Sequence, residues 1–281
     1  MTGEEALSPV VAVMLILAIV ITFFTLFNAT VVPAMKEQSE MEHLERVKEA
    51  FGRFDTDVHI SMAMEGDVTL KERIPLGGGD VLVNTIRSGG TLRVQELAPL
   101  FRVTIDDTYN LYAGMVEVSY QPVSNFWQDQ GYNWQYGYLN VTKHNGRVRT
   151  PLEYPRMEDV SLEGFANSTV SIARGADGNC TLRYVNLTKG DSDFASGNGH
   201  ALLRLDALAV LYNASGWVNI TYTGGAGAPE AFGNITPRLE GQFAGCSNIL
   251  SCSYNNDTKM LAIQVRPPFT VAERHIKVSA G

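Results

Sequence analysis

The chain of 281 residues has no lysine or arginine before Lys36, although it contains 22 basic residues in all. A conventional secretory signal peptide needs a positively charged start and a short apolar core, so this N-terminus is not typical of one. Thirty acidic residues outnumber the basic ones and give a net charge of -8. This balance excludes the basic surface that nucleic-acid-binding proteins use, and we expect no nucleic acid among the partners.

Cysteine is also scarce. Cys180, Cys246 and Cys252 are too few for a disulfide scaffold, and the lone C-x5-C spacing lacks the second ligand pair of a zinc site. We interpret Cys246 and Cys252 as a structural disulfide, with Cys180 buried or free.

Motifs of nucleophilic or phosphate chemistry are absent too. The sequence has no G-x-S-x-G, H-E-x-x-H or G-x-x-x-x-G-K-[ST] motif, and its five histidines are scattered singly. Asp55 with Asp57, and Asp191 with Asp193, resemble calcium-binding pairs but lack the glycine and distal glutamate of an EF-hand loop. We read them as solvated acidic turns, and we predict that the protein is not an enzyme and has no cofactor.

One long apolar segment dominates the N-terminus. From Ala6 to Met35 there is no charged residue, and Val10 to Phe27 is interrupted only by Thr22 and Thr25. A helix of that length spans about 27 Å, close to the hydrocarbon thickness of a bilayer. We expect one set of its side chains to lie in a membrane or in a filament core: Val10, Val13, Leu17, Ile21, Phe24 and Phe27.

A second, amphipathic stretch follows. Its apolar residues are spaced three and four apart and are separated by charged residues that favour helix. We expect the helix to continue through this stretch, bent at Pro33, and to pack one narrow stripe on a domain: Leu44, Val47, Phe51, Phe54 and Val58. We place the helical region at residues 1–54 and a β-rich domain at 55–281.

The start of the apolar segment, Ala6-Leu7-Ser8-Pro9-Val10-Val11-Ala12-Val13-Met14-Leu15, resembles the Ser-Pro-Val start of the archaeal type IV pilin N-terminal domain. The resemblance covers about 30 residues. It implies a class III signal peptide, cut by a prepilin peptidase before a segment that becomes the filament core. Gly3 is then a possible cleavage point that leaves Glu4 as the new terminus, although Met1-Thr2-Gly3 lacks the basic residue usual in that family.

After Asp55 the apolar period changes from 3.6 to 2, which indicates strands. Clusters of Gly, Asn and Ser separate the segments, so we expect an antiparallel β-sandwich or roll and an α+β fold overall. The expected strands are Val58 to Met64, Asp80 to Ile86, Thr91 to Glu96, Phe101 to Ile105, Met115 to Tyr120, Thr181 to Leu187, Ala207 to Tyr212, Trp217 to Tyr222 and Met260 to Val265.

N-x-[ST] sequons occur nine times, where chance predicts about two from the content of Asn, Ser and Thr. The positive-inside rule alone would place the domain in the cytoplasm, because Lys36, Arg46 and Lys48 follow the apolar segment. The sequon excess outweighs those few charges, so we expect the domain to be extracellular and N-glycosylated. Leaving out Asn28, close to the apolar run, and Asn234, followed by Pro237, the candidate acceptors are Asn140, Asn167, Asn179, Asn186, Asn213, Asn219 and Asn256.

Alternating aromatic residues mark one further candidate surface: Trp127, Tyr132, Trp134, Tyr136 and Tyr138. In a strand the last four would project from one face, interleaved with amides, where a sugar ring stacks. The favoured interpretation is packing, in which the rings cover the amphipathic helix or fill an interface between subunits.

The leading functional expectation is a pilin-like subunit of a surface filament, with copies of itself or other pilins as partners. The alternative is a membrane-anchored surface protein whose β domain binds glycan or cell-wall partners. N-terminal processing separates the two, because removal of a leader near Gly3 favours the filament.

Overall fold

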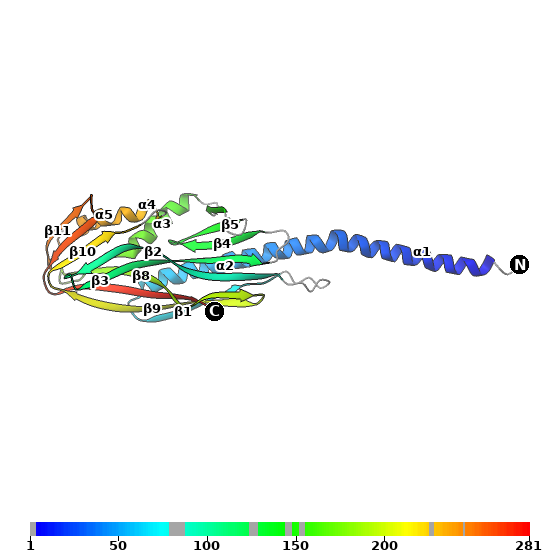
Figure 1. Ribbon diagram of the computed structural model, residues 1–281, viewed down its shortest axis with the longest axis horizontal. Helices are drawn as coiled ribbons and strands as arrows, with labels where there is room; N and C mark the ends of the chain where they lie inside the picture. Colours follow the sequence, from blue (N-terminus) through cyan, green and yellow to red (C-terminus); the bar gives the residue numbers. More distant parts are fainter. Residues whose placement is uncertain are drawn as a thin grey trace.

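One long helical rod begins the chain. The computed structural model describes residues 4–78, 88–123, 129–143, 148–151, 155–224, 228–243 and 245–281. Helix α1 (Glu4–Leu26) passes through the π-helical segment η1 (Phe27–Val31) into α2 (Val32–Ala63). Figure 1 shows the N-terminal half of the rod projecting alone from one end of the molecule, while its other half runs into the β domain. The predicted α+β fold, a long N-terminal helix followed by a β domain, is confirmed.

The π-helical segment lies directly before Pro33. The Val32 N–H bonds to the carbonyl of Phe27, five residues earlier. Proline has no N–H to donate, and its ring clashes with the carbonyl four residues back in a regular α-helix. A π segment widens the helix locally and gives that ring room. The disturbance expected at Pro33 therefore takes the form of a π segment.

Strands and short helices make up the remainder of the described chain. The strands are β1 (Val68–Pro75), β2 (Gly89–Ile105), β3 (Tyr109–Val123), β4 (Gln130–Gln135), β5 (Tyr138–Lys143), β6 (Val148–Pro151), β7 (Val170–Arg174), β8 (Cys180–Gly197), β9 (His200–Ala214), β10 (Trp217–Tyr222), β11 (Ile249–Asn255), β12 (Met260–Val265) and β13 (Phe269–Ala280). The helices are α3 (Pro155–Thr169), α4 (Glu230–Gly233) and α5 (Ile235–Gln242).

The main sheet curls around the rod. Its strands pair in the order β1-β9-β13-β8-β2-β3-β4-β5-β6, and the β8 and β13 pair is parallel while its neighbours are antiparallel. Helix α2 contacts β1 and β9 from one end of this order and β4 and β5 from the other. One face of the C-terminal half of the rod is therefore covered by the sheet, and the opposite face is exposed.

A register shift between Leu97 and Phe101 divides β2 into two parts. Beyond the shift, β2 pairs with β10, which continues through β12 to β11. These strands, with α5, form the end of the molecule opposite the N-terminus in Figure 1. A β-bulge of this kind bends a strand and lets one sheet separate into two layers.

The predicted packing stripe of the helix faces the curled sheet. Its five members are all buried: Leu44, Val47, Phe51, Phe54 and Val58. The Phe54 ring meets Trp134 of β4 edge to face with centroids 5.2 Å apart, and Phe51 lies 6.4 Å from Tyr132. These residues of α2 belong to the hydrophobic core of the β domain. Packing therefore holds the helical rod on the β domain.

The helix ends at Ala63, later than predicted. The segment Val58 to Met64 is therefore wrong as a strand: Val58 and Ser61 are buried and continue the helical stripe. The predicted strand Asp80 to Ile86 falls outside the described residues. The other predicted segments lie in strands: Thr91 to Glu96, Phe101 to Ile105, Met115 to Tyr120, Thr181 to Leu187, Ala207 to Tyr212, Trp217 to Tyr222 and Met260 to Val265.

Candidate functional surfaces

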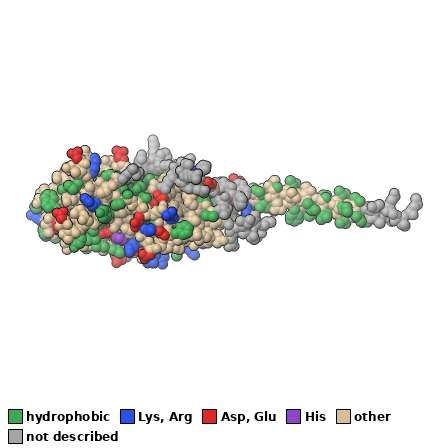
Figure 2. Space-filling view, viewed as in Figure 1, with side chains coloured by type: hydrophobic (Ala, Val, Ile, Leu, Met, Phe, Trp, Pro, Cys, Tyr) green, Lys and Arg blue, Asp and Glu red, His purple; other side chains and the backbone are tan. Residues whose placement is uncertain are grey.

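The projecting half of the rod is an exposed apolar surface. The helix from Pro9 to Ala63 is long and apolar enough to cross a membrane, and none of its most apolar window is buried in the protein. Figure 2 shows hydrophobic side chains along this shaft, in contrast to the charged surface of the β domain. Of the six predicted residues five are exposed, namely Val10, Val13, Leu17, Ile21 and Phe24, and Phe27 is half-buried.

Exposed apolar residues occur at nearly every position of the shaft, including Val11, Met14, Ile16 and Phe23, and not on one face. A helix that is apolar all round requires apolar surroundings on every side. We call the exposed segment from Val10 to Leu26 the apolar shaft.

Polar side chains in and just after the apolar shaft bond within the helix. The hydroxyls of Thr22 and Thr25 donate to the carbonyls of Ala18 and Ile21 at 2.7 and 2.8 Å. The Asn28 amide donates to Phe24, and the Thr30 hydroxyl to Leu26, in the same manner. Unpaired donors are costly in a medium without water, so these bonds suit the segment to lipid or to a bundle of helices.

The predicted processing site lies at the start of this rod. Glu4 is the first residue of α1, and Gly3 lies outside the described residues.

The aromatic candidates of β4 are core residues. Tyr132 and Trp134 are fully buried against Phe51 and Phe54, and the Trp134 Nε1 donates to Asp55 Oδ1 at 2.8 Å. This is the packing interpretation, and these two rings present no face to a sugar. Tyr136 sits at the turn with φ of 54° and packs on Phe232 at 5.6 Å, so it does not continue the strand face.

Tyr138, in β5, is half-buried and packs against the core, while Trp127 lies outside the described residues.

The seven candidate glycosylation sites differ in exposure. Asn167, Asn213 and Asn256 are exposed, and Asn179 and Asn219 are half-buried. Asn140 is buried in β5, opposite Asn133 of β4, so the folded domain does not present it as an acceptor. Asn186 is half-buried, and its Nδ2 donates to Glu273 at 2.8 Å. Because a glycan would be attached to that same Nδ2 atom, the hydrogen bond disfavours Asn186 as an acceptor.

The predicted disulfide is wrong. Cys180 at the start of β8 bonds to Cys246, which follows α5, and Cys252 of β11 is a free thiol. Asn248 supports the bonded pair, since its side chain accepts from the Cys180 N–H and donates to the Cys180 carbonyl, both at 2.9 Å. Cys252 pairs in register with Ile263 of β12 and is partly covered by the core. Burial raises the pKa of its thiol to about 11, so the thiol is protonated at neutral pH.

The prediction of acidic turns is wrong for both pairs, because Asp55 and Asp57 lie in α2 and Asp191 and Asp193 lie in β8. Asp55 and His59 lie one turn apart on α2 with 3.8 Å between Oδ2 and Nε2, and Asp193 pairs with Lys189 at 2.9 Å. Within the ranges that the structure describes, no three side chains of His, Cys, Asp or Glu converge as metal ligands.

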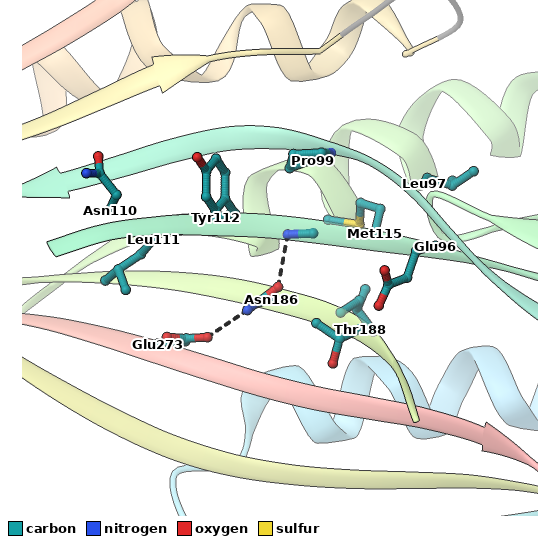
Figure 3. Close-up of a pocket in the computed structure, with 12 residues that line it drawn as sticks. Glu96, Leu97, Pro99, Asn110, Leu111, Tyr112, Met115, Asn186, Thr188 and Glu273 are labelled. Carbon is teal, nitrogen blue, oxygen red and sulfur yellow. Dashed lines mark hydrogen bonds between the residues drawn. The ribbon is translucent and has the colours of Figure 1, made fainter. Parts of the chain in front are cut away.

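A groove of about 410 Å³ lies between β2, β3 and β8 at the bulge of β2 (Figure 3). We call it the seam groove. Its walls include Glu96 and Pro99 of β2 with Tyr112 of β3, and its floor includes Asn186 of β8 and Glu273 of β13. In the sequence Asn186 is marked only by its sequon, and Glu273 belongs to no motif. Polar residues occur throughout β13, including Thr270, Arg274 and Lys277, so the sequence does not distinguish Glu273 from them.

Glu273 is the centre of a hydrogen-bond network under this groove. Its carboxylate accepts from Tyr184 and Tyr212 hydroxyls at 2.8 and 3.0 Å, and from Asn186 Nδ2 at 2.8 Å. The His275 Nδ1 lies 3.1 Å from its Oε1. Burial raises the pKa of Glu273, but these four hydrogen bonds outweigh burial and lower the pKa to about 2. The carboxylate is therefore ionised at neutral pH and holds its neighbours in place.

The network extends to Thr188, whose hydroxyl lies 3.1 Å from His275 Nε2. A line of hydroxyl, imidazole and carboxylate is also found in acyl-transfer enzymes. Such enzymes further need donors aimed at the oxyanion, and Glu273 here is shared with three groups outside the line. The network fits a structural floor for the groove, and absence of enzyme activity stays a prediction.

No protein-family model, curated protein or solved structure matches the chain.

Proposed function

We propose that the protein is a structural subunit of a pilus-like surface filament, assembled through its N-terminal helix. The observation that carries the proposal is the apolar shaft, which is exposed on every side and continuous with a helix fixed in the core of the β domain. Side chains of Leu, Ile, Val and Phe are accommodated equally well by lipid and by neighbouring helices, because association in both media depends on packing. The mechanism is thus burial of the apolar shaft among copies of the same helix.

The β domain supports an extracellular location in this proposal. Disulfides persist in oxidising compartments, and Cys180 is bonded to Cys246. Asn167, Asn213 and Asn256 offer exposed sequon side chains for glycosylation. Both features point to a domain that has been translocated across the membrane, with the apolar shaft left at the membrane or in the filament.

The resemblance of Ala6 to Leu15 to archaeal type IV pilins adds an expected processing step near Gly3. In this proposal a peptidase removes the residues before Glu4, and the freed segment leaves the bilayer for the filament. A segment that is not cut stays in the bilayer as an anchor, which is the competing function.

N-terminal peptide mass analysis of the protein from producing cells tests the proposal. Surface material removed by shearing and the membrane fraction are analysed separately. We expect a shortened N-terminus beginning near Glu4 and recovery in the sheared, filamentous fraction. Full-length protein confined to the membrane fraction would contradict assembly and leave a membrane-anchored surface protein.

A further inference from the structure

The size and openness of the seam groove suit a small ligand. Its volume of about 410 Å³ lies within the range of roughly 300–1,000 Å³ that small-molecule sites occupy. The groove lies at the bulge of β2, between Leu97 and Phe101, where the two layers of the domain separate. A ligand there would contact β2, β3 and β8 together.

The charge of the groove restricts the class of ligand. Its described lining residues include two carboxylates, Glu96 and Glu273, and no lysine or arginine. Anionic ligands such as phosphates are disfavoured there because nothing in the lining compensates their charge. Glu273 is already paired with four donors, and Glu96 Oε1 accepts from the Lys189 N–H at 3.1 Å. Glu273 is therefore fully engaged inside the protein, while Glu96 is exposed at the rim and keeps acceptor capacity for a neutral ligand.

The side chains at the rim suit a ring that has an apolar face and hydroxyl edges. Tyr112 is 49% exposed, and in Figure 3 it projects from β3 on the same side as Asn110, with Pro99 beside it. The face of an aromatic ring packs on the C–H face of a sugar. The Asn110 amide, the Thr188 hydroxyl and the Glu96 carboxylate supply donors and acceptors for hydroxyl groups.

The floor of the groove is held rigid before any ligand arrives. Asn186 Oδ1 accepts from the Gly114 N–H at 3.1 Å while its Nδ2 donates to Glu273, as the dashed lines in Figure 3 show. A Cβ at position 114 would lie 2.9 Å from both Asn186 Oδ1 and the Leu187 carbonyl, so glycine permits this approach of β3 to β8. Binding sites that are preorganised in this way lose less entropy when a ligand binds.

We infer that the seam groove binds an uncharged saccharide, with Tyr112 as the stacking residue. The inference is independent of filament assembly, because the groove lies within the β domain and does not involve the apolar shaft. This saccharide site differs from the aromatic surface predicted from the sequence, because the rings of Tyr132 and Trp134 are buried.

The test uses the full chain in micelles of an amine-oxide detergent, which has no sugar headgroup. Glucose, galactose, mannose and lactose are titrated separately, and binding is followed by saturation-transfer NMR. We expect at least one of these sugars to bind the wild-type protein and to bind Tyr112→Ala at least about tenfold more weakly. Trp217→Ala is the matched control, because Trp217 is an aromatic residue of β10 that is similarly exposed at 45% and does not line the groove.

Thermal unfolding followed by circular dichroism checks that each variant is folded. If Tyr112→Ala lowers the midpoint by more than a few degrees, Asn110→Ala at the same rim takes its place, with the same expected loss. Absence of binding by all four sugars overturns the inference. So does binding that survives Tyr112→Ala and Asn110→Ala, or binding of inorganic phosphate or arginine methyl ester in place of the sugars.

Discussion

Arg274 Nε donates a hydrogen bond of 2.7 Å to the carbonyl oxygen of Ser61, and this bond joins β13 to the last turn of α2. The final carbonyls of a helix have no partner within it, and a positive charge there complements the helix dipole. Arg274 is buried, so this bond is shielded from water. The end of the rod is thereby fixed to β13 as well as packed in the core.

Replacing Arg274 with alanine should reduce the free energy of unfolding by about 2–3 kcal/mol, because it leaves the Ser61 carbonyl unpaired and opens a cavity. Chemical denaturation of the full chain in micelles measures this change. Lys277→Ala, an exposed position on the same strand, is the control and should stay within about 0.5 kcal/mol of wild type. Equal stability of Arg274→Ala and Lys277→Ala would mean that the bond does not hold the rod.

Removing the Cys180 and Cys246 disulfide by a double serine substitution should destabilise the domain by roughly 4 kcal/mol, since the bond closes a separation of 66 residues. Cys252→Ala is the matched control and should have little effect, because Cys252 is a free thiol. Thermal unfolding with and without reductant measures both. Reductant sensitivity that depends on Cys252 would instead support the pairing of Cys246 with Cys252.

The sequence predicts best where a periodic pattern runs through one element. Leu44 and Phe51 are predicted to lie on a packing face because the spacing of a single helix determines that face. The prediction of a strand from Val58 to Met64 is wrong, because apolar and polar residues alternate there for only a few positions. The buried stripe of the helix continues through them from Phe54 to Ser61.

What the sequence does not predict are contacts between elements that lie far apart in the chain. Cys180 meets Cys246 because Asn248 and the turn after α5 come back to the start of β8, and no local spacing indicates this. The seam groove likewise needs Tyr112, Asn186 and Glu273 on three strands whose order in the sheet differs from their order in the chain.

Acid should weaken the fold through Glu273. Its pKa falls from the ordinary value of 4.5 to about 2 in the folded protein, so its ionised form stabilises the fold above pH 4.5. That stabilisation is lost as the pH falls through 2, and about 1.4 kcal/mol per pH unit gives roughly 3 kcal/mol in all. In Glu273→Gln the free energy of unfolding should change less between pH 5 and 2. An identical pH profile in the two proteins would contradict the network around this carboxylate.

Glycans should be found on Asn213 and Asn256, whose side chains are exposed, and not on Asn140, which is buried between β4 and β6. The check is mass analysis of glycopeptides from the protein made by its native cells. A glycan on Asn140 would contradict the packing of β5, and a chain without any glycan would count against the extracellular location. Asn140→Gln and Asn213→Gln then serve as a pair, since only the second should reduce the total glycan mass.

Replacing Leu17 with lysine should prevent filament assembly and leave membrane insertion largely intact. Leu17 lies near the middle of the apolar shaft and is 57% exposed, so a lysine there meets lipid or a neighbouring helix and costs about 3 kcal/mol at the centre of a bilayer. Met41→Lys is the matched control: Met41 is 53% exposed on the same rod, among charged residues beside the β domain, and its replacement should leave both processes intact. The amounts of protein in sheared surface material and in membranes are compared for the two variants.

If Leu17→Lys protein reaches the sheared filaments as wild type does, the shaft is not the assembly surface. If it is lost from filaments but retained in membranes, packing between helices is more sensitive to the charge than insertion is, which is the outcome expected when each shaft is enclosed by other shafts.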